Sequence, residues 1–131
     1  MDSLIKNILS ESKIIAVVGA SPKPGRVSGT IAKFLSEVGY KVYPVNPLYE
    51  EVAGLKCYTN LSEIKIKIDI VNIFRKSEDV FPIVEEAAKI GAKNIWMQLG
   101  IVNYKAENFA ITSGLKVIMD KCIMVEYNKY F

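Results

Sequence analysis

Two arginines stand out among the side chains whose types suit chemistry. Of the 17 lysines and arginines in the 131-residue chain, only Arg26 and Arg75 are arginine. A guanidinium forms two parallel hydrogen bonds with a phosphate, whereas a lysine ammonium acts as a point charge. We therefore interpret both as phosphate ligands. The alternative is an ion pair with an acid, such as Glu78 or Asp79 for Arg75, and for that residue the two roles are evenly balanced.

Arg26 belongs to a loop that separates an apolar run from a helical pattern. The apolar run ends at Gly19, and a strand, a turn and a helix N-terminus in this order form a common phosphate-binding arrangement. The loop departs from Gly-x-Gly-x-x-Gly because Ser21 replaces the second glycine. Asn46 stands where an acid would hold the ribose of NAD. These departures argue against an NAD enzyme and are compatible with another adenine nucleotide that carries additional phosphate.

The elements that must position these residues alternate along the chain. Apolar runs predict strands over 14–19, 41–45, 69–74, 93–97 and 115–119, and apolar residues at helical spacing predict helices over 3–12, 28–38, 77–90 and 103–113. Ser28, Ser77 and Asn103 are the expected N-caps. A short edge strand over 56–58 and one helical turn over 61–64, capped by Asn60, are also expected. The alternation predicts an α/β fold, a doubly wound parallel sheet of about five strands with helices on both faces in three layers. Residues 120–131 show no clear period.

Ligands of such sheets bind outside the carboxyl ends of the strands. The residues there are mostly small or polar, and they are Ala20, Ser21, Lys23, Arg26, Asn46, Pro47, Arg75, Gln98, Gly100, Asp120 and Cys122. Cys122 either faces the ligand or fills space as a small apolar thiol. Asp120 caps or orients the terminal segment.

The composition limits the possible partners and chemistry. The length predicts a single domain over 1–131, and the net charge of +3 comes mainly from scattered lysines, so nucleic acid is not an expected partner. The chain contains no signal-peptide pattern and no apolar run of the roughly 20 residues that a membrane span needs. We therefore expect a cytoplasmic protein without a membrane partner. The chain lacks histidine, which removes histidine-based catalysis and makes a protein zinc site improbable.

Five motifs resemble those of the small single-domain CoA-binding proteins, which are similar to the CoA-binding domain of succinyl-CoA synthetase. They are Val-Val-Gly-Ala-Ser-Pro-Lys-Pro-x-Arg (17–26), Val-Asn-Pro (45–47), Ile-Phe-Arg (73–75), Trp-Met-Gln-Leu-Gly-Ile-Val-Asn (96–103) and Met-Asp-x-Cys (119–122). The resemblance implies a Rossmann-like fold and coenzyme A as the cofactor. Many relatives carry Arg and His where this chain has Lys121 and Tyr127, and the phosphorylated histidine of the synthetase has no counterpart. Neither a role for that histidine nor ligase chemistry is therefore implied.

The resemblance also assigns roles to individual residues. The turn at Gly19, Ala20 and Ser21 would meet the phosphates together with Arg26, and Lys23 and Ser28 belong to the same predicted site. Asn46 and Pro47 would border the adenosine, with Phe74 and Arg75 beside the nucleotide. Gln98, Gly100 and Ile101 would line the path of the pantetheine arm.

Three functions follow from these observations. The first is a non-catalytic module that binds CoA or an acyl-CoA. The alternative is an enzyme, either an NAD(P)-binding oxidoreductase or an acyl-CoA-handling activity. The third is a regulatory or assembly partner, with a homodimer formed through the aromatic tail of Tyr127, Tyr130 and Phe131.

Overall fold

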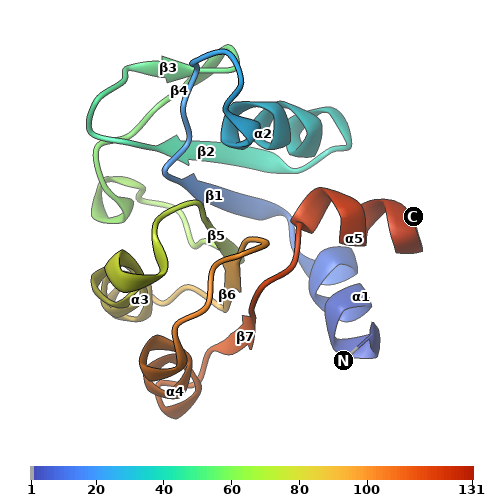
Figure 1. Cartoon of the computed structure of the whole chain (residues 1–131), viewed down its shortest axis with the longest axis vertical. Coiled ribbons are helices and arrows are strands. Elements are labelled where there is room, and N and C mark those ends of the chain that lie inside the picture. Colours follow the sequence, from blue (N-terminus) through green and yellow to red (C-terminus); the bar gives the residue numbers. More distant parts are fainter. Residues whose placement is uncertain (1) are drawn as a thin grey trace.

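The computed structural model describes residues 2–131 and contains the expected parallel sheet (Figure 1). Its strands are β1 (Ile14–Val18), β2 (Lys41–Val45), β5 (Ile70–Ile73), β6 (Asn94–Met97) and β7 (Lys116–Ile118). They lie in the order β2-β1-β5-β6-β7. The chain therefore leaves β1 in one direction to form β2 and returns to the other side of β1 to form β5. This reversal between β1 and β5 is the switch point at which such sheets bind ligands.

Helices cover both faces of the sheet, which confirms the three layers (Figure 1). Helices α1 (Asp2–Glu11), α2 (Val27–Glu37) and α5 (Ile123–Tyr130) lie on one face, and α3 (Val80–Lys89) and α4 (Tyr104–Thr112) lie on the other. Successive residues of β1 point to opposite faces. Ile15 and Val17 therefore pack in the core under α1, α2 and α5, and Ala16 and Val18 pack in the core under α3 and α4. Burial on both faces explains why this strand is continuously apolar.

The segment between β2 and β5 holds three short elements. Strands β3 (Glu51–Val52) and β4 (Leu55–Lys56) form an antiparallel hairpin that turns at Gly54. The predicted edge strand over 56–58 is therefore confirmed only in part, since Lys56 ends β4 and Tyr58 makes a single bridge to Val45. The predicted turn is confirmed: Asn60 caps the 3-10 helix η1 (Leu61–Glu63) by accepting a hydrogen bond from the Glu63 N–H.

Two of the three predicted caps are wrong. Helix α2 begins at Val27, so Ser28 lies inside its first turn, where its hydroxyl accepts a hydrogen bond from the Ser21 N–H at 3.0 Å. Ser77 opens the 3-10 helix η2 (Ser77–Asp79) before α3, and its hydroxyl accepts from the Val102 N–H at 3.0 Å. The donor to Ser28 comes from the loop that precedes α2, and the donor to Ser77 comes from the distant loop after β6. The Asn103 cap of α4 is confirmed, with the Ala106 N–H as its donor.

The C-terminal segment forms a helix that the sequence pattern did not indicate. Ile123, Glu126, Tyr127 and Tyr130 follow one another at helical spacing in α5, but the buried Glu126 interrupts their apolar character. The ring of Tyr127 packs edge-on against Phe34 and Tyr40 at centroid distances of 5.6 and 6.0 Å. The aromatic tail thus covers the α2 side of the sheet. Within residues 2–131, no helix has the length and apolar character that crossing a bilayer requires.

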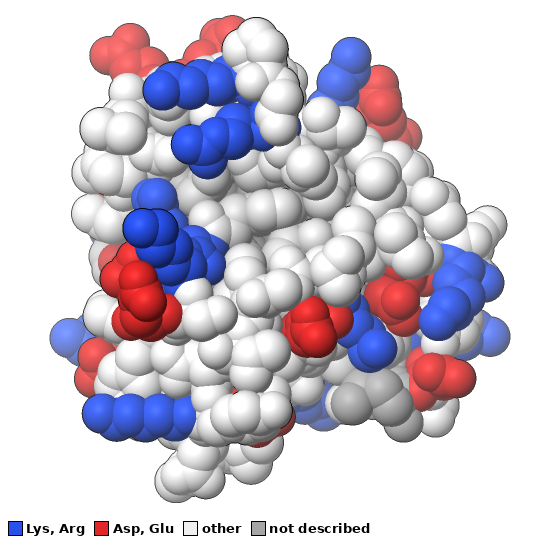
Figure 2. Space-filling view, in the orientation of Figure 1, with Lys and Arg blue, Asp and Glu red and all other residues white. Residues whose placement is uncertain are grey.

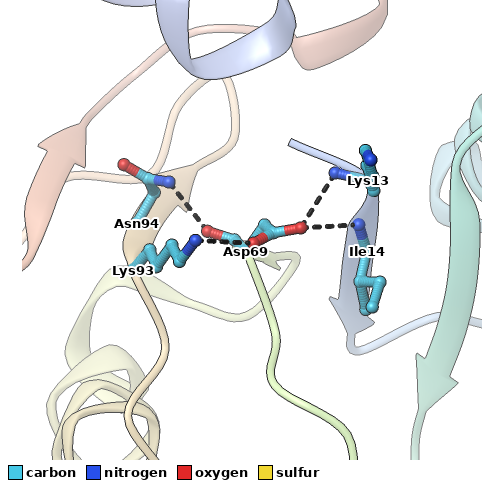
Figure 3. A network of polar contacts seen from close by, with 5 residues as sticks. All are labelled: Lys13, Ile14, Asp69, Lys93 and Asn94. Atoms are coloured by element: carbon cyan, nitrogen blue, oxygen red, sulfur yellow. Dashed lines mark hydrogen bonds and ion pairs between the residues drawn. The ribbon is translucent and has the colours of Figure 1, made fainter. Parts of the chain in front are cut away.

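A polar network closes the amino-terminal edge of the sheet (Figure 3). The carboxylate of Asp69 accepts hydrogen bonds from the N–H groups of Lys13 and Ile14 at 2.8 and 3.0 Å. The Lys93 ammonium lies 3.5 Å from the same carboxylate. Burial opposes ionisation of this carboxyl, but the two N–H donors and the ammonium outweigh it and lower the pKa of Asp69. Asp69 therefore joins β1, β5 and β6 where they begin.

Candidate functional site

A cavity of about 430 Å³ opens at the carboxyl edge of the sheet, between the loops that follow β1 and β5. Its walls come from four segments of the chain, and the lining residues are Gly19, Arg26, Val27, Ser28, Phe74, Arg75, Lys76, Asp79 and Ile101. This β1–β5 cavity coincides with the switch point of the strand order. The fold thus brings Arg26 and Arg75 into one site, as the strand-end argument predicted.

Neither arginine forms an ion pair with another residue of the described range 2–131. The ion pairs formed by residues 2–131 are Lys93 with Asp69 and Lys129 with Glu126. Asp79 lines the same cavity but lies beyond the 4.0 Å limit from Arg75, so the alternative role of Arg75 is not observed. Figure 2 shows basic side chains in two groups on the left of the view, beside an uncharged central surface. The cavity lining therefore contains three basic side chains and one acidic side chain, Asp79, and among residues 2–131 neither arginine is ion-paired.

Gly19 and Gly29 give the loop after β1 its shape. Gly19 has a φ of +89°, and a Cβ at this position would overlap the carbonyl oxygen of Phe74. A Cβ on Gly29 would meet the carbonyl oxygen of Ser21 in the same way. Only glycine permits these approaches, so the turns after β1 and β5 pack directly against each other.

The two serines predicted to contact the ligand are engaged within the loop. The Ser21 hydroxyl accepts a hydrogen bond from the Lys23 N–H at 3.2 Å, and the Ser28 hydroxyl accepts from the Ser21 N–H. Both side chains are buried. Ser21, Lys23 and Arg26 also line a smaller hollow of about 290 Å³ next to the cavity. Arg26 therefore borders both spaces, and its exposed side chain can reach a ligand in either.

Asn46 connects the loops that follow β1 and β2. Its side-chain amide donates to the Ala20 carbonyl at 3.0 Å, and its oxygen accepts from the Leu48 N–H at 3.0 Å. The side chain is 5% exposed, while the next residue, Pro47, is exposed. The structure shows Asn46 as a strut between the loops and places neither residue in the lining of the β1–β5 cavity.

The loop after β6 is held from two sides. The buried Gln98 oxygen accepts hydrogen bonds from the Asn72 amide at 3.2 Å and from the Ile123 N–H at 3.0 Å, which fixes the start of α5. Gly100 has a φ of +85° and donates its N–H to the Asp120 carboxylate at 2.6 Å. Asp120 thus joins the loop after β7 to the loop after β6. Asp120 was predicted to cap or orient the terminal segment, but its carboxylate accepts from the loop after β6, and α5 has no side-chain cap.

The remaining predicted residues differ in their distance from the cavity. Ile101 lines it, whereas Cys122 is half-buried among the core residues beneath α5. Sequence reasoning did not assign Val27 or Lys76 to the site, although each directly follows one of the two arginines. That adjacency was the available signal, because residues next to a loop arginine share its edge of the sheet.

Other hollows and titratable groups do not form a comparable site. Hollows of about 700 Å³ beside α3 and α4 and about 600 Å³ beside β4 and η1 contain no arginine and lie away from the switch point. Burial raises the pKa of Tyr40 to about 12 and also raises the pKa of the Cys57 thiol. Neither residue lines the β1–β5 cavity. In residues 2–131, no three metal-binding side chains come together.

Comparison with known proteins connects this geometry to a family. A family model described as a CoA binding domain matches residues 13–128. The uncharacterised protein YneT of Bacillus subtilis is 44% identical over 123 residues, which cover 94% of this chain and 91% of the relative. The structure of a hypothetical protein from Pyrococcus horikoshii OT3 superimposes with a TM-score of 0.95 at 44% identity. The match covers 99% of this chain and 92% of the Pyrococcus chain.

A longer relative contains a domain that is similar to this chain. The ADP-forming acetate–CoA ligase of Methanocaldococcus jannaschii is 32% identical over 123 residues, which cover 88% of this chain but 18% of the ligase. The chain thus spans about a fifth of that ligase and is homologous to one of its domains. The match over residues 13–128 and the likeness of the fold agree with the resemblance of the five motifs. The chain therefore belongs to the CoA-binding domain family.

Proposed function

We propose that the chain binds coenzyme A or an acyl-CoA in the β1–β5 cavity and acts as a binding module. The observation that carries this proposal is the pair of arginines in one cavity without a carboxylate partner. An anion would satisfy the half-buried guanidinium of Arg75, and a diphosphate supplies oxygens in the geometry that arginine binds best. Arg26 is exposed and Arg75 is half-buried, so both are accessible to a ligand.

The arrangement of the loops supports a definite orientation of the ligand. The diphosphate would lie between Arg26 and Arg75, at the close approach of Gly19 to Phe74. The adenosine would lie on the β2 side, near the exposed Pro47 and the strut formed by Asn46. The pantetheine arm would leave along Ile101, on the β6 side. Asn46 and Gln98 would then act by holding the loops, because their partners lie within the protein.

Binding without catalysis is the simpler use of this site. The chain has no histidine and spans about a fifth of the homologous ligase, so the ligase reaction is not transferred to it. The side chains that line the cavity include no cysteine, serine–base pair or other activated nucleophile. Charge and shape at the cavity suffice for binding an anionic cofactor.

Isothermal titration calorimetry with CoA, NAD and NADP tests the proposal. We expect CoA to bind most tightly, because Asn46 replaces the acid that would hold the ribose of NAD. Thermal unfolding with each ligand provides an independent measurement, since a ligand that binds only the folded state raises the melting temperature. Stronger stabilisation by NAD than by CoA would contradict the proposal and favour the oxidoreductase alternative.

A further inference from the structure

Asp120 places a fixed negative charge at the far end of the proposed ligand path. Its backbone has a φ of +60°, a conformation that aspartate and asparagine tolerate better than most residues. Its carboxylate accepts the Gly100 N–H at 2.6 Å, which holds the group against the loop after β6. The position of this charge is therefore set by the backbone of two loops and not by a mobile side chain alone.

The Asp120 carboxylate forms no ion pair with the described residues 2–131. The side chain is exposed, and the ion pairs within residues 2–131 involve Asp69 and Glu126 as their acids. Lys121 is the next residue, but its ammonium lies beyond 4.0 Å from the Asp120 carboxylate. One hydrogen bond from Gly100 leaves most of the acceptor capacity of the carboxylate directed to solvent.

The surface next to Asp120 is apolar. Leu99 is 68% exposed, which is unusual for leucine, and Ile101 lines the β1–β5 cavity. Both residues flank Gly100, so the loop that Asp120 holds presents apolar side chains on either side of the bonded N–H. An uncharged hydrocarbon group could contact these two apolar side chains, whereas a carboxylate there would face the negative charge of Asp120.

The strand order gives the ligand path its direction. The two arginines lie on the loops of the neighbouring strands β1 and β5, and the following strands on that side are β6 and then β7. A ligand whose phosphates lie between the arginines and whose arm passes Ile101 reaches the loop after β6. Asp120, at the end of β7, comes next. An acyl group at the end of that arm would then lie on the side of the site where Asp120 is bonded to Gly100, the neighbour of the cavity-lining Ile101.

We propose that Asp120 is a specificity-determining residue that makes the site select CoA thioesters with an uncharged acyl group over those whose acyl group ends in a carboxylate. This inference rests on the proposed CoA-binding function. Two like charges about 4 Å apart in water change an equilibrium about fivefold, which sets the scale of the expected discrimination.

Butyryl-CoA and succinyl-CoA form a matched pair for the test, because both acyl chains contain four carbons and they differ in a terminal methyl or carboxylate. Calorimetry at low ionic strength should show butyryl-CoA binding about fivefold more tightly. Raising the salt concentration should reduce this ratio, because salt screens exposed charges. Asp120→Asn should bring the ratio close to one, since asparagine tolerates the left-handed backbone and keeps an acceptor for Gly100 while losing the charge. Glu37→Gln, an exposed change at the end of α2, is the control for net charge.

The outcomes separate the two proposals. If free CoA binds but wild-type protein binds both thioesters equally, the selectivity is refuted and the CoA site stands. The same holds if Asp120→Asn, shown to be folded by circular dichroism, retains the wild-type ratio. If none of the three ligands binds, the proposed function itself is refuted.

Discussion

The two edges of the sheet differ in whether their charged side chains find partners within the protein. At the amino-terminal edge, Asp69 receives two N–H groups and the Lys93 ammonium, so donors and acceptor satisfy one another (Figure 3). At the carboxyl edge, Arg26 and Arg75 line one cavity and form no ion pair within the described part of the chain. A charge that is satisfied within the protein stabilises the fold, whereas a charge that the protein leaves unsatisfied is available to a ligand. The amino-terminal edge is therefore the one that stabilises the fold, and the carboxyl edge is the one proposed to bind the ligand.

The largest effect is expected at Gly19, where the carboxyl edge also depends on tight packing. Gly19→Ala adds a Cβ that overlaps the Phe74 carbonyl, and it requires alanine to adopt the positive φ of this position. We therefore expect a loss of about 3–4 kcal/mol in the free energy of unfolding. Gly25→Ala is the control, because its φ is +83° but no atom lies within 4 Å. It should cost about 1–2 kcal/mol in urea unfolding. Equal losses in the two variants would show that the approach to Phe74 is unimportant.

The next effect concerns the amino-terminal edge. Asp69→Ala leaves the N–H groups of Lys13 and Ile14 without their acceptor, and we expect a loss of about 2–3 kcal/mol in the free energy of unfolding. Lys93→Ala removes only an ammonium that is 58% exposed and should cost less than about 1 kcal/mol. CoA affinity, measured by calorimetry on the folded protein, should stay at the wild-type value in both. A weakened affinity would mean that the two edges are coupled.

Arg26→Ala tests the other side of the comparison. We expect CoA binding to weaken by about 1–3 kcal/mol, because a charge-assisted hydrogen bond to phosphate is lost, while the free energy of unfolding stays within about 0.5 kcal/mol of the wild type. Lys89→Ala, in the last turn of α3, removes the same charge away from the cavity and serves as the control. Unchanged CoA affinity in Arg26→Ala would contradict the assigned site.

The smallest effect is a dependence of stability on pH. Because folding lowers the pKa of Asp69 below its usual value of 3.8, its stabilisation is complete well above pH 3.8 and is lost as the pH falls through the lower value of the folded protein. The difference in unfolding free energy between wild type and Asp69→Asn should therefore shrink steadily in acid. Urea titrations between about pH 6 and pH 2 measure it. A constant difference across this range would show that the ionised carboxylate is not the stabilising form.

Much of the fold could be predicted from local pattern. The five strands and four of the helices were expected near their observed positions, because continuous apolar runs and helical spacing are properties of neighbouring residues. Helix α5 was missed because the buried Glu126 interrupts its apolar face. The caps assigned to Ser28 and Ser77 were wrong because those hydroxyls accept hydrogen bonds from loop N–H groups outside their helices, those of Ser21 and Val102.

The sequence by itself determined the residue types at each strand end, including both arginines, the glycine that ends β1 and the five motifs of the family. Which of these residues share a cavity, and which form hydrogen bonds that hold other loops, depends on the tertiary structure. Asn46 and Gln98 have the same polar character as ligand-binding residues, yet their hydrogen bonds go to Ala20, Leu48, Asn72 and Ile123. Strand order and loop packing make that distinction, because a hydrogen bond depends on what lies within about 3 Å in space and not on position along the chain.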